Sequence, residues 1–295
     1  MIAVLLATLS GLSYGAGDFS GALATKRNNA ALVTLIVQVI SFAALGVLLL
    51  FTFDGAITTA DLAWGALAGL GATVGLTTFY RALAEGPMST AASVTALIGS
   101  LLPVSAGLLL GEVPNNPTLV GIALAIPSAI IVSIGGLEAH SLARTLNPRA
   151  RAAARAQIAA TRRLSIVAGL GFGVFFVALA QASPDAGLFP LVGARAASIV
   201  VLAAILTFQK TWNRVDRADY APIGVAGLLD CAANSFYLLA LAGGSVTWVA
   251  AVVSLYPAAT VILARIFLKE HLSRVQIVGL VMASSSLVFV GLGAT

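Results

Sequence analysis

Long uninterrupted apolar runs limit the fold of this chain more than any other feature of its sequence. Cutting the sequence at its polar connectors leaves ten such runs, at 2–24, 30–52, 60–83, 88–110, 118–136, 164–182, 187–208, 219–241, 245–267 and 273–293. Each run is long enough to cross the roughly 30 Å hydrocarbon core of a bilayer as an α-helix. None shows the alternating polarity of transmembrane β-strands. The sequence therefore predicts an all-α, polytopic membrane protein of ten transmembrane helices.

Composition supports this class and argues against several chemistries. The chain is 59% hydrophobic and 9% charged, whereas soluble domains carry about 25% charged residues. It has one cysteine, Cys231, so an intramolecular disulfide is excluded. The two histidines, His140 and His271, both lie beside charged connectors. We expect no metal site, no cofactor and no nucleic-acid partner.

The basic residues fall on alternate connectors, and this pattern predicts an orientation. Lysine or arginine lies in or beside each connector after an odd-numbered run, with Arg81 at the end of the third run itself, whereas connectors after even-numbered runs and both tails carry none. Positive charges favour the cytoplasmic side. We therefore expect a multi-pass protein of the bacterial inner membrane with both termini extracytoplasmic. Because most connectors are short, we also expect consecutive helices to pack as antiparallel neighbours.

The long connector 137–163 differs from the others because it carries six arginines and one glutamate. One interpretation is a positive loop that fixes the topology. A second is that 144–163 forms an Ala/Arg-rich helix lying on anionic lipid headgroups. Both interpretations stay open from the sequence.

An internal repeat appears when the sequence is compared with itself at an offset of 158 positions. The matched pairs, here called offset mates, include Gly11/Gly169, Gly15/Gly173, Asp61/Asp219, Gly69/Gly227, Gly86/Gly244, Glu112/Glu270, Gly121/Gly279 and Gly135/Gly293. The pattern predicts a five-helix repeat at 1–136, a basic cytoplasmic linker at 137–163 and a second five-helix repeat at 164–295. An odd number of helices per repeat places the second repeat upside down relative to the first. Such inverted repeats are typical of secondary transporters.

The chain also resembles a known family. Tyr14-Gly15 in the first run, and the LLLGE segment followed by leucine and glycine near the end of the first half, look like EamA domains of the drug/metabolite transporter superfamily. The second half, SLYPAATVILARIFLKEHLSRVQIVGLVMASSSLVFVG at 254–291, is the closer match, since Gly99 in the first half stands where Pro257 stands in the second. The resemblance implies a transporter, and length and layout look most similar to the YddG-type exporters of aromatic amino acids.

Three ionisable residues, Asp18, Arg195 and Asp230, lie well inside the apolar runs. A charge at that depth costs at least a few kcal/mol unless it faces a wet cavity or a partner. Arg195 is a candidate for binding a substrate carboxylate, and Asp230 for binding an ammonium group or carrying a proton. Asp18 is a weaker candidate for coupling. The alternative is a structural pair between Arg195 and Asp230.

Aromatic and polar residues are the other candidate substrate contacts. Asp230, Asn234 and Tyr237 follow i, i+4, i+7 spacing and therefore share one helix face. Further candidates come from runs that also contain small or polar residues: Tyr14, Gln38, Tyr80, Trp248 and Tyr256. Aromatic rings with a few polar groups suit an amphiphilic solute. Ordinary core packing is the alternative for each of them.

Three prolines inside the runs, Pro103, Pro127 and Pro257, are candidate hinges. Each removes a backbone hydrogen bond and permits a kink. Static packing is the alternative, since a proline in a transmembrane helix often serves packing rather than movement.

The leading functional hypothesis is a monomeric secondary transporter that exports amino acids, aromatic or apolar ones first, by alternating access. A carrier of drugs or other metabolites is the alternative within transport. An integral membrane enzyme would need a cluster of His, Asp or Glu near one membrane surface, and the short connectors do not supply one. We therefore expect a transporter and not an enzyme, with a small molecule and the bilayer as its partners.

Overall fold

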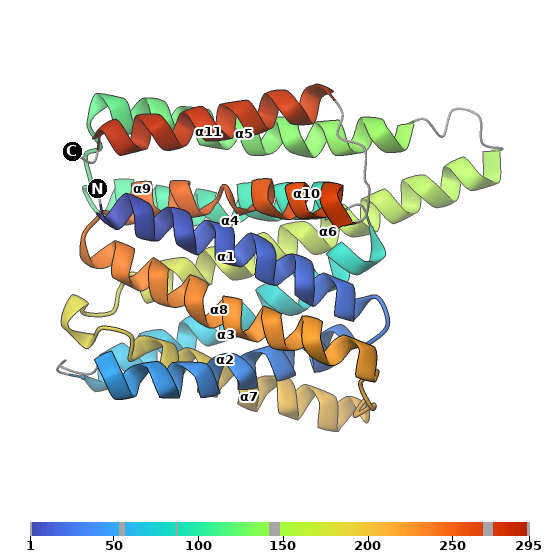
Figure 1. Cartoon of the computed structure of the whole chain (residues 1–295), viewed down its shortest axis with the longest axis horizontal. Helices are drawn as coiled ribbons and strands as arrows, with labels where there is room; N and C mark the ends of the chain where they lie inside the picture. The colour runs from blue at the N-terminus through green and yellow to red at the C-terminus, as the bar shows by residue number, and fades with distance from the viewer. Residues whose placement is uncertain (1, 53–56, 87, 142–147, 268–273, 294–295) are drawn as a thin grey trace.

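The computed structural model describes residues 2–52, 57–86, 88–141, 148–267 and 274–293, and this part of the chain is helical with short turns between the helices (Figure 1). Eight of its helical segments are long and apolar enough to cross a membrane, and shorter apolar stretches lie at Asn116–Ala125 and Ile277–Ser286. The structure therefore confirms the predicted all-α polytopic membrane fold.

The helices follow the predicted apolar runs closely. They are α1 (Ile2–Thr25), α2 (Ala30–Thr52), α3 (Thr59–Glu85), α4 (Met88–Leu109), α5 (Asn116–Ser141), α6 (Pro148–Leu179), α7 (Pro190–Gln209), α8 (Tyr220–Ala242), α9 (Val246–Val253), α10 (Tyr256–Phe267) and α11 (Arg274–Gly293), with short 3-10 turns at Pro184–Ala186 and Arg217–Asp219. The apolar run expected at 245–267 is divided into α9 and α10 by a turn at Ser254 and Leu255.

The basic linker expected at 137–163 is largely helical in the structure. Helix α5 continues to Ser141, and α6 already begins at Pro148 rather than at 164. Alanine and arginine are good helix formers, and proline is well tolerated at a first helical position, which explains the early start. Figure 1 shows this arginine-rich part of α6 continuing the axis of its helix beyond the other helices.

The connectors sort onto two ends of the bundle. Both chain termini lie at one end, together with the α2–α3, α4–α5, α6–α7 and α8–α9 connectors; we call this the terminal end (Figure 1). The α1–α2, α3–α4 and α7–α8 connectors lie at the opposite end, where α10 finishes and α11 begins. We call it the basic end, since Lys26, Arg81, Lys210 and Arg217 belong there. The arrangement of connectors matches the alternation seen in the sequence.

The most extensive helix contacts join the two halves of the chain rather than consecutive helices. Helix α1 packs on α8 and α3 packs on α6, while α5 packs on α11 and α4 on α6. Consecutive helices such as α4 and α5 or α2 and α3 are in contact, as expected, but less extensively than these pairs. Short connectors fix only the direction of the next helix, whereas the repeat brings each helix to a surface of the other half.

The contacts between halves repeat under the offset of 158. A Cβ on Gly11 of α1 would lie 3.4 Å from the Val253 carbonyl oxygen of α9, and one on Gly169 of α6 would lie 2.8 Å from the Thr95 carbonyl oxygen of α4. Thr95 and Val253 are themselves offset mates. Small residues allow helix backbones to approach this closely. Figure 1 shows α1 and α6 running in opposite directions, as an inverted repeat requires.

The acidic mates Asp61 and Asp219 make equivalent connections at opposite ends of the bundle. Asp61 of α3 accepts a hydrogen bond from the Ser183 backbone N–H in the α6–α7 connector, at 2.7 Å. Asp219, just before α8, accepts one from the Asn28 side chain in the α1–α2 connector, at 2.8 Å. In each half, an aspartate therefore accepts a hydrogen bond from the first connector of the other half.

Candidate functional site

A small cavity lies between the two halves near the middle of the bundle, and α1, α2, α3, α6, α7, α8 and α10 contribute to its wall. The lining residues are Tyr14, Asp18, Gln38, Ala72, Leu76, Phe172, Phe175, Phe176, Arg195, Asp230, Asn234 and Tyr256. Its volume is about 30 Å³, which is room for about two water molecules. A solute larger than water requires the helices to separate.

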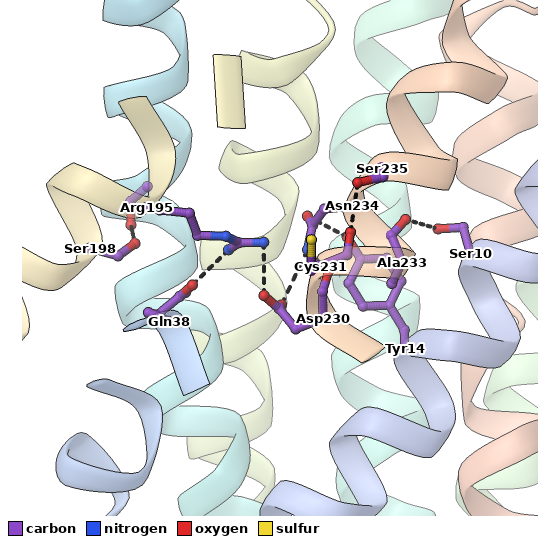
Figure 2. A network of polar contacts seen from close by, with 11 residues as sticks. Ser10, Tyr14, Gln38, Arg195, Ser198, Asp230, Cys231, Ala233, Asn234 and Ser235 are labelled. Atoms are coloured by element: carbon purple, nitrogen blue, oxygen red, sulfur yellow. Dashed lines mark hydrogen bonds and ion pairs between the residues drawn. The ribbon is translucent and has the colours of Figure 1, made fainter. Parts of the chain in front are cut away.

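A continuous chain of polar contacts runs along one side of this cavity (Figure 2). Arg195 of α7 donates from Nη1 to Gln38 Oε1 of α2 at 2.7 Å, and its Nη2 lies 2.8 Å from Asp230 Oδ2 of α8. Asn234 donates to Asp230 Oδ1 at 3.2 Å, one helical turn along α8. The Tyr14 hydroxyl of α1 donates to Asn234 Oδ1 at 2.7 Å. Four helices therefore meet through one network.

The network buries an ion pair at membrane depth. Side-chain exposure is 2% for Arg195 and 13% for Asp230. The pairing between Arg195 and Asp230, one of the two interpretations of the sequence, is therefore present, and both residues also line the cavity. Burial without a partner would be costly for either charge. Each residue accordingly compensates the other in this conformation.

Several polar atoms of the network still lack hydrogen bonds. Arg195 Nε, Gln38 Nε2 and the Tyr256 hydroxyl are buried with no hydrogen-bond partner, and all three residues line the cavity. The contact between Arg195 Nη2 and Asp230 Oδ2 is an ion pair rather than a directed hydrogen bond, because neither atom has hydrogen-bond geometry with any partner. Buried polar groups are normally satisfied. The unused donors are thus available to a polar group that enters the cavity.

Three predicted substrate contacts lie away from the cavity. Tyr80 of α3 is buried toward the basic end against Gly21 of α1, where a Cβ would lie 2.4 Å from its hydroxyl oxygen if glycine were replaced. Tyr237 of α8 is buried toward the terminal end and donates to the Phe176 carbonyl at 3.2 Å. Trp248 of α9 is buried in the apolar core beside Gly244. These side chains pack the helices together in this conformation.

Five lining residues did not appear among the sequence candidates: Ala72, Leu76, Phe172, Phe175 and Phe176. Apolar side chains in an apolar run carry no sign of a cavity. A signal was nevertheless present for four of them, because Phe172 and Phe176 are the offset mates of Tyr14 and Asp18, and Ala72 and Leu76 are the offset mates of Asp230 and Asn234. An inverted repeat brings mates to opposite sides of a shared axis.

The candidate hinge prolines have different surroundings. Pro103 lies within a continuous α4 and Pro127 within a continuous α5. Pro257 is the second residue of α10, directly after the turn that separates α10 from α9. Proline is well tolerated in the first turn of a helix because it lacks an N–H. Of the three positions, the interruption of a helix is found at Pro257.

Two further cavities lie at the opposite ends of the bundle and are related by the repeat. At the basic end, a cavity of about 610 Å³ lies between the α1–α2 connector, the end of α3 and α7. At the terminal end, one of about 190 Å³ lies between the α6–α7 connector, the end of α8 and the start of α9. The lining residues Lys26 and Pro184 are offset mates, as are Arg81 and Leu239. Of these two cavities, the one at the basic end is the larger.

Glu112 lines the smaller cavity at the terminal end. Its carboxylate accepts hydrogen bonds from the backbone N–H groups of Val246 at 2.9 Å and Thr247 at 2.8 Å, and from the Thr247 hydroxyl. It thereby caps the first turn of α9, whose own N-cap residue Ser245 makes no side-chain cap. The offset mate Glu270 lies outside the described residues.

Within the described residues, no group of three or more His, Cys, Asp or Glu side chains is placed to hold a metal ion. The cavity instead combines a buried ion pair, unused hydrogen-bond donors and aromatic rings. Such a lining suits an amphiphilic molecule.

Comparison with known proteins finds a family model that matches most of the second half of the chain. Residues 163–292 match the EamA-like transporter family. No curated protein matches the chain. Among solved structures, a crystal structure described only as that of a protein superposes with a TM-score of 0.67, covering 97% of this chain and 96% of that chain at 16% identity. This likeness shows a shared fold over 97% of the chain, and residues 163–292 resemble a transporter domain.

Proposed function

We propose that this chain, with its EamA-like transporter domain at 163–292, is a secondary transporter that exports amino acids with aromatic or apolar side chains by alternating access. The observation that carries the proposal is the buried Arg195–Asp230 pair in a cavity that is otherwise largely aromatic. An amino acid presents the same two charges on a small apolar body. It matches both the pair and its surroundings.

Substrate binding would exchange one ion pair for two. The substrate carboxylate binds the guanidinium of Arg195, whose planar donors suit a carboxylate. The substrate ammonium group binds the released carboxylate of Asp230 and also Asn234 Oδ1, which already accepts a hydrogen bond from the Tyr14 hydroxyl. No charge is then left uncompensated in the membrane at either stage, so the exchange avoids the large cost of an isolated buried ion.

The two end cavities support alternating access between the ends. The larger cavity lies at the basic end, while the smaller one lies at the terminal end beside the capped start of α9. Positive connectors favour the cytoplasm, so the end with the larger cavity faces the cytoplasm in our proposal and both termini are extracytoplasmic. Loading from the cytoplasm is what an exporter of the inner membrane requires.

The orientation has a direct test by cysteine labelling. In a variant with Cys231→Ser and Thr295→Cys, a membrane-impermeant maleimide added to intact cells should label the new cysteine. Cys231 is buried, so the parent protein serves as the background control. Labelling that requires permeabilised cells would overturn the proposed orientation.

Two energy sources fit the carboxylates of the cavity. Proton antiport would use Asp230, or less directly Asp18, as the proton carrier, whereas passive equilibration needs neither. Asp18 is 6% exposed and has no ion pair among the described residues. Efflux from proteoliposomes with and without a pH gradient distinguishes the two modes. We further propose a monomer, with anionic lipids as partners of the arginines at 144–163.

A panel flux assay tests the central proposal. Purified protein in proteoliposomes should exchange radiolabelled phenylalanine and leucine faster than glutamate or lysine, because the cavity has one pair of opposite charges and an apolar remainder. Equal exchange of cationic drugs and neutral metabolites, with no preference for amino acids, would favour the broader carrier of drugs or metabolites. Product formation from any solute would instead indicate an enzyme.

A further inference from the structure

The walls of the central cavity are equivalent in position but opposite in chemistry. Four polar lining residues lie on α1 and α8, and each has an apolar offset mate on α6 or α3. The pairs are Tyr14/Phe172, Asp18/Phe176, Asp230/Ala72 and Asn234/Leu76, and all eight residues line the same cavity. We call the first four the polar wall and their mates the apolar wall. The repeat thus places two chemically different walls around one axis.

This difference has a consequence for how a solute is held. Two identical walls around a twofold axis would accept an amphiphile in two opposite orientations. Here hydrogen bonds connect Tyr14, Asn234 and Asp230 on the polar wall, whereas Phe172, Phe176 and Leu76 offer no polar side-chain atom. A charged head group is therefore stabilised on one side of the axis, and an apolar group on the other.

The aromatic part of the apolar wall is held by ring contacts. Phe172 meets Phe79 edge-on, with ring centroids 5.7 Å apart. Phe176 meets Tyr14 at 5.9 Å and Tyr237 at 4.8 Å. Ring pairs at these separations add to the stability gained from burial alone. These contacts hold the rings in place, so the apolar wall limits the size of the apolar group that fits against it.

The geometry points to the apolar wall as the subsite that selects the substrate side chain, with Phe172 and Ala72 as size-determining residues. Phe172 is a large residue whose truncation widens the subsite, and Ala72 is a small one whose enlargement fills it. The inference rests on the proposed amino-acid transport, and it adds one fixed orientation: the amino acid's charged groups on Arg195 and the polar wall, and its side chain on the apolar wall.

Two substitutions that change the volume in opposite directions provide the test. The ratio of kcat/KM for tryptophan to that for leucine is measured by efflux from proteoliposomes for the parent, Phe172→Leu and Ala72→Val. A change of about one methylene in an apolar pocket alters selectivity by about ten-fold or more. Phe172→Leu should raise the ratio by about ten-fold, and Ala72→Val should lower it by a similar factor.

Phe19→Leu is the matched control. Phe19 is a buried phenylalanine of α1 that contacts Phe267, with ring centroids 5.8 Å apart, and it does not line the cavity. The control should keep the parent ratio. If either variant elutes as aggregate in detergent, the other still decides the outcome, since each has its own predicted direction.

The outcomes separate the subsite from the function on which it rests. Active variants that keep the parent's tryptophan-to-leucine ratio would overturn the apolar wall as the selecting surface, while leaving amino-acid transport intact. A parent protein that moves no amino acid would overturn both. A ratio that shifts equally in Phe19→Leu would show a general effect of core volume, and this too would overturn the subsite.

Discussion

The α1–α8 interface and the α3–α6 interface occupy equivalent places in the two halves, yet they are built differently. In α1–α8, the Ser10 hydroxyl donates to the Ala233 carbonyl at 2.8 Å and Tyr14 donates to Asn234. The matching positions in α3–α6 are Ala168, Gly75, Phe172 and Leu76. There, a Cβ on Gly171 would lie 2.6 Å from the Gly75 backbone nitrogen.

This difference separates the features that hold the fold together from those that we assign to substrate binding. Close helix approach is present at both interfaces, whereas these hydrogen bonds between side chains and the neighbouring helix are found at α1–α8. Hydrogen bonds between membrane helices average only about 0.6 kcal/mol. We therefore expect these hydrogen bonds to contribute little to holding α1 and α8 together, and the conversion of their residues to the α3–α6 residues tests their role in transport.

Asp230→Ala should have the largest effect, and it gives α8 the residue that α3 has at Ala72. The substitution leaves the Arg195 guanidinium buried without its counter-charge, which costs about 3–5 kcal/mol. We expect amino-acid efflux to fall at least about 100-fold and the midpoint of thermal unfolding in detergent to fall as well. Both are measured at matched protein amounts.

A double variant separates the structural loss from the functional one. Arg195 has Val37 as its offset mate, so Asp230→Ala with Arg195→Val removes both charges and leaves an apolar position. The thermal midpoint should return toward that of the parent while transport stays lost. Recovery of transport in the double variant would contradict a role for the pair in binding.

Gly75→Ala tests the close approach at α3–α6. A Cβ at Gly75 would lie 2.8 Å from Phe172 Cδ1 and 3.1 Å from the Phe172 backbone nitrogen. Overpacking of this kind typically costs about 1–3 kcal/mol, so the thermal midpoint should fall by several degrees. Gly46→Ala is the control, because a Cβ there meets nothing within 4 Å. Equal midpoints for both variants would show that the approach is not limiting.

Much of the fold could be predicted from the sequence because each membrane helix requires a long apolar run, which is easy to recognise. The apolar runs, the alternating basic connectors and the offset of 158 all depend on local composition. The turn at Ser254 and Leu255 was not predicted, since neither residue breaks a helix by itself. The early start of α6 agrees with only one of the two interpretations of 144–163, because an alanine- and arginine-rich stretch is compatible with both a loop and a helix.

The polar part of the candidate site was easier to predict than the apolar part. Arg195 and Asp230 are conspicuous because charges are costly in a membrane, and the i, i+4 spacing placed Asp230 and Asn234 on one face. Phe175 has no such signal, since an apolar residue is equally suitable for lipid, core or cavity. Tyr80 was chosen by residue type and Tyr237 by its spacing from Asp230, but both side chains are buried in packed core at either end of the cavity.

Tyr14→Phe should have a moderate effect, and it makes α1 match Phe172 of α6. The hydroxyl that orients Asn234 is lost, while the ring and its edge contact with Phe176 stay. A hydrogen bond is worth about 1 kcal/mol, so kcat/KM for amino-acid efflux should fall about five-fold. The thermal midpoint should change little. A larger loss of stability than of transport would assign Tyr14 to packing rather than to the substrate.

Ser10→Ala should have the smallest effect, although it removes a buried hydrogen bond between the two halves. The acceptor, the Ala233 carbonyl, lies within α8, so its helical hydrogen bond remains available to it. The offset mate Ala168 shows that this place in the fold functions with alanine. We expect a thermal midpoint within about one degree of the parent's, because the lost bond averages about 0.6 kcal/mol, and unchanged efflux. A fall in the thermal midpoint comparable to that of Gly75→Ala would mean that the α1–α8 interface depends on hydrogen bonding, whereas the α3–α6 interface depends on close packing. The two interfaces would then differ in how they stabilise the fold as well as in their contacts with the substrate.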